Sequence, residues 1–178
     1  MILIQGKGVS GGVAMGPLYY YRRAEATMIR HEIANPEAEW NRFKAAQARA
    51  VEQLGKLADK ARKEAGDEAA LLFETHQMMA EDMDFEEVIQ TAIWDKRLNA
   101  EAVVEDAAKQ FAEKFETMED PYFQARAADV KDVSARIIAV LTGNVQDGID
   151  SPVPVILAAD DLAPARRFSW TSAKFSVS

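Results

Sequence analysis

The chain has 178 residues, of which 48% are hydrophobic and 28% charged, a composition typical of a folded globular protein. Its net charge of -8, without a block of Lys and Arg, argues against nucleic acid and favours a basic protein partner. Without cysteine the sequence has no disulfide and no thiolate chemistry. No apolar run approaches the roughly 18 residues of a membrane span. We therefore expect a cytoplasmic protein that binds neither nucleic acid nor membrane.

The N-terminal stretch predicts a strand, a glycine-rich turn and a second strand that includes residues 13–21. The spacing of Gly6, Gly8 and Gly11 fits the dinucleotide motif G-x-G-x-x-G. That motif needs a helix after the glycines, whereas the sequence GVAMGPLYYY favours a strand. We therefore do not expect a nucleotide site here.

Long helices are predicted from residue 35 onward. Asn35 and Pro36 form a start signal for a helix of about eight turns, which Gly66 ends. A second helix starts at the acidic pair after Gly66, where Asp67 or a neighbour can cap it. This helix should break near residues 82–84 and then continue to Trp94.

Two more helices are predicted to follow. Asn99 opens one of them, and Pro121 opens the last, which the pair Gly143 and Asn144 ends. Short connections between long helices imply antiparallel neighbours. Because residues 153–159 again predict a strand, we expect a mostly α fold with flanking β. In it a helical bundle of about four helices, one bent, is inserted between strands.

The stretch from Gly66 to Glu87 suggests a docking surface. Leucines and methionines recur there at three- and four-residue steps and run out into acidic residues. The methionines Met78 and Met79 fit a docking face and a core equally well, since methionine serves both uses. His31 and His76 lack the spacing of a metal site or a serine motif, so we interpret both as solvent-exposed, non-catalytic residues.

Four blocks, in order, resemble a known family. They are GVSGGVAMGPLYYY, LLFETHQMMAEDMDF, YFQARAADVKDVSARII and VILAADDLAP. They are similar to the N-terminal region of phosphoenolpyruvate-protein phosphotransferase, enzyme I of the bacterial sugar phosphotransferase system. The resemblance implies an incomplete α/β phosphohistidine subdomain, formed by residues 1–23 and 145–164. It also implies that residues 24–144 form a helical subdomain that binds the phosphocarrier HPr.

The resemblance also implies which residues contact HPr. The acidic pair that faces the carrier's arginine is Asp67 and Glu68. The apolar patch comprises Leu71, Met78, Met79, Phe85, Phe115 and Phe123. The charged rim comprises Asp82, Asp84 and Arg126. Ala125 stands where the family usually has Glu, and several apolar positions are bulkier than in common family forms, which could change carrier preference.

In this family a histidine within a motif close to G-G-x-x-S-H takes phosphate from phosphoenolpyruvate with the help of magnesium. Neither His31 nor His76 matches that motif, and we expect this chain to lack the phosphoenolpyruvate-binding barrel that provides dimer contacts in the family. The family is a transferase. For this chain the resemblance implies the carrier-binding part, with no catalytic residue, metal or cofactor of its own, as a monomer.

The tail of residues 165–178 departs from the family pattern directly after Pro164. A shifted frame can encode SETVQLDKRKVLSF, which resembles the family's continuation, so our hypothesis is a lost base near Pro164. A diverged C-terminus or an added tail is the alternative. Two alternatives to HPr binding also stay open. One is an enzyme I-like segment of a dihydroxyacetone kinase phosphotransfer subunit or a nitrogen-branch paralogue, and the other is a non-catalytic helical interaction domain.

Overall fold

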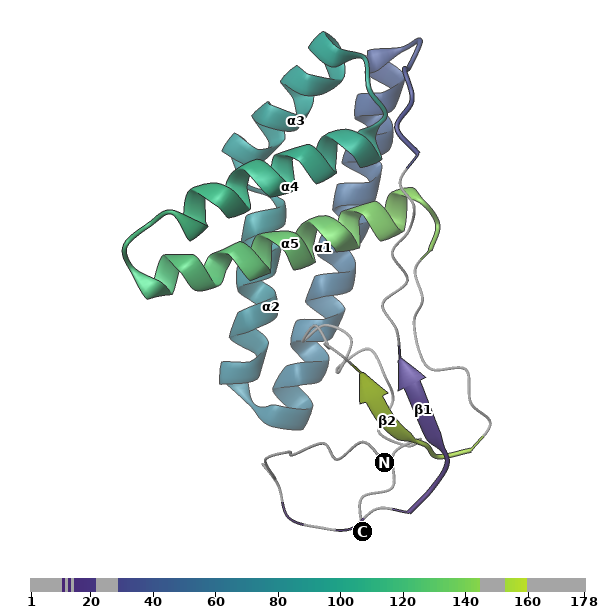
Figure 1. The fold of residues 1–178 in the computed structure, drawn as a ribbon, viewed down its shortest axis with the longest axis vertical. Coiled ribbons are helices and arrows are strands. Elements are labelled where there is room, and N and C mark those ends of the chain that lie inside the picture. Colours follow the sequence, from purple (N-terminus) through teal and green to yellow (C-terminus); the bar gives the residue numbers. More distant parts are fainter. Residues whose placement is uncertain (1–10, 12, 14, 22–28, 145–152, 160–178) are drawn as a thin grey trace, which may run out of the picture.

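The structure is a computed structural model that describes residues 11, 13, 15–21, 29–144 and 153–159. Within these residues the fold is mostly helical, with one pair of short strands, as the sequence predicts (Figure 1). In chain order the elements are β1 (Leu18–Tyr21), α1 (Pro36–Ala65), α2 (Asp67–Ala80), α3 (Met83–Lys96), α4 (Ala100–Glu116), α5 (Pro121–Leu141) and β2 (Ile156–Ala159).

The start of α1 is set by local capping. The Asn35 side chain accepts a hydrogen bond from the Ala38 amide at 3.1 Å, and Pro36 takes the first helical position, as predicted. Gly66 ends α1 with a φ of 89°, a conformation that favours glycine. The prediction that Asp67 or a neighbour caps α2 is wrong, because no side chain caps this helix. Asp67 lies instead in its first turn, where negative charge suits the helix dipole.

The predicted break in the second helical segment is confirmed. It separates α2 from α3 at Glu81 and Asp82. The Asp82 carboxylate accepts a hydrogen bond from the Phe85 amide at 2.9 Å and so caps α3. The predicted bundle of about four helices therefore corresponds to α1, α4, α5 and one bent helix, which is the pair α2 and α3.

The starts of α4 and α5 also lie at the predicted residues. Asp120 caps α5 by accepting from the Tyr122 amide at 2.8 Å, with Pro121 at the first helical position. Asn99 precedes α4 but does not cap it. Its side chain instead accepts from the His31 amide at 3.0 Å and donates to Glu101 at 2.9 Å, so it fixes the segment that leads into α1.

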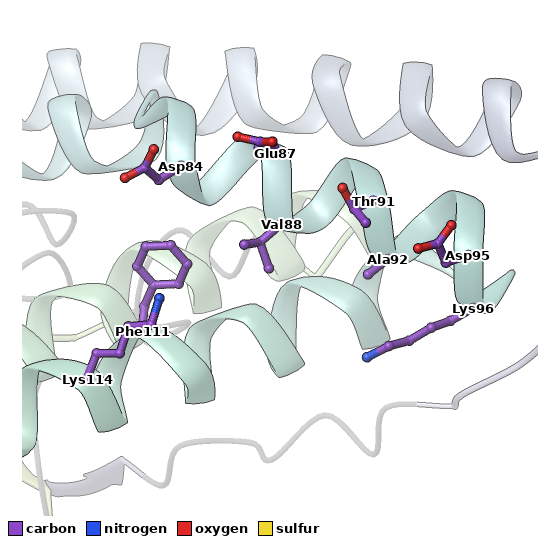
Figure 2. Close-up of a pocket in the computed structure, with 9 residues that line it drawn as sticks. All are labelled: Asp84, Glu87, Val88, Thr91, Ala92, Asp95, Lys96, Phe111 and Lys114. Atoms are coloured by element: carbon purple, nitrogen blue, oxygen red, sulfur yellow. The ribbon is translucent and has the colours of Figure 1, made fainter.

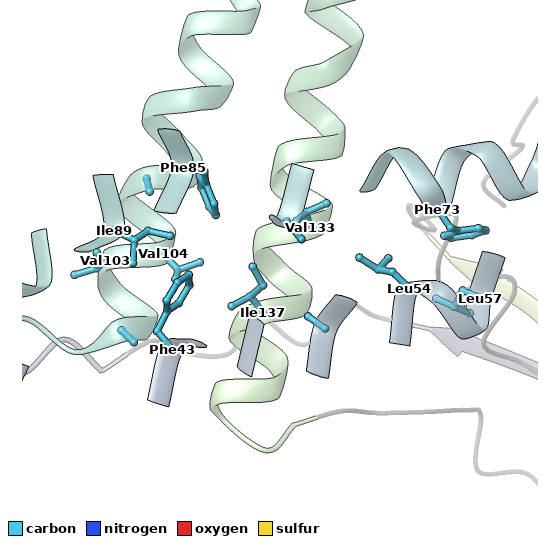
Figure 3. Packing of buried hydrophobic residues seen from close by; sticks show 14 of the residues in the cluster. Phe43, Leu54, Leu57, Phe73, Phe85, Ile89, Val103, Val104, Val133 and Ile137 are labelled. Atoms are coloured by element: carbon cyan, nitrogen blue, oxygen red, sulfur yellow. The ribbon is translucent and has the colours of Figure 1, made fainter. Parts of the chain in front are cut away.

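The helices form two antiparallel hairpins that cross. Helix α1 packs mainly against α2, and α4 packs mainly against α5. Figure 1 shows the second hairpin lying across the first, while α3 extends beyond the end of α2. The shared core contains large apolar side chains from all five helices (Figure 3). Fully buried examples are Phe43, Leu54, Phe73, Ile89, Val104 and Ile137.

The two strands pair in parallel, from Leu18 with Ile156 to Tyr21 with Ala159. Parallel neighbours need a long crossover connection, and here the whole helical bundle lies between them in the chain. This arrangement confirms the predicted helical insertion between strands. The predicted strand near the N-terminus, the turn of residues 145–152 and the tail of residues 165–178 lie outside the described residues.

Candidate docking site

The acidic pair Asp67 and Glu68 lies exposed in the first turn of α2. Arg62, in the last turn of α1, reaches this turn: its Nε lies 3.1 Å from the Asp67 carboxylate, and its guanidinium also pairs with Glu74. A third contact joins Arg62 to Asp59 at 3.3 Å. Three acids thus share one arginine at the tip of the first hairpin, which leaves this end of the bundle acidic.

The outward face of α2 carries two exposed apolar side chains. Leu71 is 57% exposed and Met78 is 65% exposed, seven residues apart and so on one side of the helix. Met79 is only partly exposed and packs against the core. Of the two methionines, Met78 therefore lies at the surface and fits the docking face, whereas Met79 belongs to the core. We call Asp67, Glu68, Leu71 and Met78 the α2 patch.

The α2–α3 junction contains one residue that differs from its predicted place. Phe85 is only 4% exposed and packs edge to face against Phe111, with ring centroids 5.4 Å apart. It was expected in the exposed apolar patch, and that expectation is wrong, because its position in the first turn of α3 faces α4. Asp82 serves as the α3 cap, and Asp84 is exposed.

A second exposed apolar cluster lies where α4 turns into α5. Phe123 is 42% exposed, and its ring meets that of Tyr122 edge to face at 5.5 Å. Tyr122 itself is 60% exposed, and Met118 is 40% exposed in the turn. We call Met118, Tyr122 and Phe123 the turn patch. Phe115, in the last turn of α4, is half-buried.

At the α2–α3 and α4–α5 junctions, three exposed apolar residues were not predicted as site members: Met83, Met118 and Tyr122. Met83 is 83% exposed at the first position of α3. A signal was available in the sequence, because each stands at a helix end next to a capping residue or in a short turn. Connections between helices run over the protein surface, so side chains there are often exposed.

Arg126 lies on α5, one turn after Tyr122 of the turn patch, and has contacts on two sides. Its guanidinium lies 4.7 Å from the Tyr122 ring centroid and donates to the Tyr122 hydroxyl at 2.5 Å. It also donates to the Asp129 carboxylate at 2.9 Å. The second oxygen of that carboxylate lies 3.2 Å from His76 Nε2. The interpretation of His76 as a surface residue is wrong: it is 1% exposed, because it lies on the side of α2 that faces α5.

The charge state of Asp129 follows from these contacts. Burial alone raises the pKa of this carboxyl group, but the hydrogen bonds from His76 and Arg126 hold its pKa below the usual value. The group is therefore ionised at neutral pH. It links α2 to α5 and so joins the helix of the α2 patch to the helix of the turn patch.

A shallow groove of about 490 Å³ lies on another face, between α3 and α4 (Figure 2). Figure 2 shows Asp84 and Phe111 at one end, and Asp95 and Lys96 at the other. Acidic and basic side chains both line it, so its charge selects no ligand class. Among the described residues no group of three or more His, Asp or Glu side chains is arranged to hold a metal ion. In the same residues no helix combines the length and apolar character needed to span a membrane.

The fold and surface described above define a helical bundle inserted between paired strands, with an acidic and apolar face. Comparison with known proteins identifies the family. The family model described as PEP-utilising enzyme, N-terminal, matches residues 5–126, and the chain belongs to this family. Phosphoenolpyruvate-protein phosphotransferase of Priestia megaterium is 33% identical over 163 residues, and that of Lactococcus lactis is 35% identical over 170. These alignments cover 91% and 92% of this chain but only 28% and 29% of those proteins.

Solved structures agree with this assignment. An NMR solution structure of an enzyme I protein matches with a TM-score of 0.78 at 30% identity, over 93% of this chain and 68% of that one. The N-terminal domain of a nitrogen enzyme 1 matches with a TM-score of 0.70 at 21% identity, over 92% and 68% of the two chains. The chain therefore has the fold of an enzyme I N-terminal domain.

Proposed function

We propose that this chain binds the phosphocarrier HPr in the cytoplasm, as a monomer, through the α2 patch and the turn patch. The observation that carries this proposal is the exposure of Leu71 and Met78 beside the carboxylates of Asp67 and Glu68. An apolar centre bordered by acids suits a fast, reversible encounter with a basic surface. The family supports a phosphocarrier as partner, and the acidic charge of the chain fits a basic one.

We propose further that the whole protein moves phosphate from phosphoenolpyruvate to HPr in sugar uptake, with magnesium. In the described part of the chain both histidines are poor phosphate acceptors in this reaction. His76 is 1% exposed and bound to Asp129, so phosphoenolpyruvate cannot reach it. His31 differs in sequence from the family's acceptor motif. The role of this part is therefore docking.

Titration of isotope-labelled HPr from Bacillus subtilis with the full chain tests the proposal. We expect saturable binding that weakens with salt, and slower association for Glu68→Arg, because charges at the rim of an interface act mainly on steering. Glu37→Arg, at the far end of α1, makes the same charge change away from the site and serves as the control.

The nitrogen-branch paralogue of HPr and the carrier domain of a dihydroxyacetone kinase phosphotransfer subunit are titrated in parallel. If the chain bound either of them more tightly than HPr, that carrier would be the partner in place of HPr. Absence of binding to all three would favour a helical interaction domain without a carrier, and the proposed function would then be abandoned.

A further inference from the structure

A line of polar contacts runs from the core of the bundle to the proposed docking surface. It begins at His76, which is 1% exposed, and passes through Asp129 to Arg126 and then to Tyr122, which is 60% exposed. The three contacts measure 3.2 Å, 2.9 Å and 2.5 Å in that order. Each oxygen of the Asp129 carboxylate takes one of the first two contacts. The carboxylate is thus bound from the core side and from the surface side together.

The direction of the hydrogen bonds follows from chemistry. An ionised carboxylate only accepts hydrogen bonds, and a guanidinium only donates them. His76 must therefore carry a proton on Nε2 and donate it to Asp129. The His76 ring is itself held in place, because it packs edge to face against Phe73 at 6.3 Å within the core. Asp129 consequently has one fixed donor that does not belong to its own helix.

This fixed donor changes what the Arg126–Asp129 pair can do. On a helix surface an isolated pair three residues apart contributes little to stability, too little to hold a long side chain in one geometry. Asp129 is fixed by a residue of a different helix, so it presents its second oxygen at a constant place. Arg126, whose side chain is 23% exposed, binds there and against the Tyr122 ring.

We infer that His76 and Asp129 are positioning residues that hold the Arg126 guanidinium ready for the carrier at the docking surface. This inference rests on the proposed function. Arg126 has five N–H donors, and its contacts with Asp129 and Tyr122 use two of them. The other donors can bind carbonyl or carboxylate oxygens of the partner. A side chain that is already ordered loses less conformational entropy on binding.

The decisive experiment is a double-mutant cycle on the full chain, with Bacillus subtilis HPr as the titrant. Asp129→Asn should weaken binding about five- to tenfold when Arg126 is present, within the coupling range of residues that share one hydrogen-bond network. In an Arg126→Met background the same change should have no further effect. An equal loss in both backgrounds, or no loss in either, would overturn the inference and leave the proposed function intact.

Variants of His76 provide a second route, should Asp129→Asn fail to fold. His76→Leu removes the donor and should weaken binding as Asp129→Asn does. His76→Gln keeps an N–H donor of similar reach and should restore most of the affinity. A histidine needed only to fill space would give the opposite order, with the leucine variant closer to the parent, and this order would overturn the inference.

A readout that needs no carrier separates the two proposals. In the parent chain the Arg126 guanidinium should rotate slowly enough to give resolved Nη resonances in NMR spectra, and Asp129→Asn should average them. If these resonances behave as expected but HPr does not bind, the proposed function fails and the positioning stands as a property of the fold. If the Arg126 Nη resonances are already averaged in the parent chain, the inference fails whether or not HPr binds.

Discussion

The Nε atom of Arg62 lies 3.1 Å from the carboxylate of Asp67, across the turn between α1 and α2. Asp67 therefore already has a cation beside it, although its side chain is 92% exposed. Among the described residues Glu68 has no ion pair. The two members of the acidic pair are thus unequal, and a basic partner must compete with Arg62 for one of them.

We predict that Arg62→Gln tightens HPr binding by about two- to threefold, since exposed ion pairs contribute less than about 1 kcal/mol. The dependence of affinity on salt should steepen, because one more carboxylate becomes available to the carrier. Titrations at two salt concentrations measure both effects.

Lys56→Gln is the matched control, because Lys56 lies on the same helix and pairs with Glu52 at 2.6 Å. It removes the same charge without releasing Asp67. An equal gain in both variants would show that net charge alone acts. The combination of Arg62→Gln with Asp67→Asn should lose most of the gain.

The neighbouring methionines of α2 should respond in opposite ways. Met78 is 65% exposed, so Met78→Asp should reduce HPr affinity by at least about tenfold and leave the melting temperature nearly unchanged. Met79 packs against the core, so Met79→Ala should lower the free energy of unfolding by about 1–3 kcal/mol. Calorimetric titration and urea unfolding measure the two effects, with Gln90→Asp on α3 as a surface control. If Met78→Asp lowered the free energy of unfolding as much as Met79→Ala, Met78 would belong to the core and the assignment would be wrong.

The aromatic residues Phe85 and Phe123 provide a similar contrast. Phe85 is 4% exposed, and truncation of a buried Phe costs about 3–5 kcal/mol, so Phe85→Ala should unfold much more readily in urea. Phe123→Ala, at a residue 42% exposed, should cost less than about 1 kcal/mol but weaken HPr binding. Equal stability losses in the two variants would mean that Phe123 belongs to the core.

Local signals in the sequence predicted the helix boundaries well. Asn35 with Pro36, Asp82 and Pro121 act on the few residues that follow them, so the pattern alone contains the information. The sequence also predicted the two strands that flank the helical insertion, but it did not predict that they pair in parallel, because their pairing joins residues far apart in sequence.

The orientation of α2 could not be predicted in the same way. Apolar residues occur on both of its sides, so the periodicity does not tell which side turns toward α5. The structure buries Phe73 and His76 and exposes Leu71 and Met78. The contact of His76 with Asp129 joins residues 53 apart in sequence, and only the packing of α2 against α5 brings them together.

The last prediction concerns acid stability and the pair Arg42 and Glu101, which joins α1 to the start of α4. Arg42 donates two hydrogen bonds to the Glu101 carboxylate, at 2.8 Å and 2.6 Å, and Asn99 donates a third at 2.9 Å. Burial raises the pKa of Glu101, but these hydrogen bonds outweigh burial and lower its pKa to about 2.

Because the folded-state pKa of Glu101 is below the unfolded value of about 4.5, the unfolded chain binds the proton more tightly. The stabilisation is therefore fully present above pH 4.5 and is lost as the pH falls toward 2. The pKa difference corresponds to at most about 3 kcal/mol, and we expect about 1–2 kcal/mol because the Arg42 side chain is 39% exposed. Glu101→Gln should lower the free energy of unfolding at pH 7 and flatten its decline between pH 4.5 and 2.

Glu105→Gln is the control, because Glu105 lies on the same helix and pairs with Lys109 at the surface. It should change neither the free energy of unfolding at pH 7 nor its decline with falling pH by more than about 0.5 kcal/mol. Urea unfolding at pH 7, 4 and 3 measures these values, and an unchanged pH slope in Glu101→Gln would show that other carboxylates control acid unfolding.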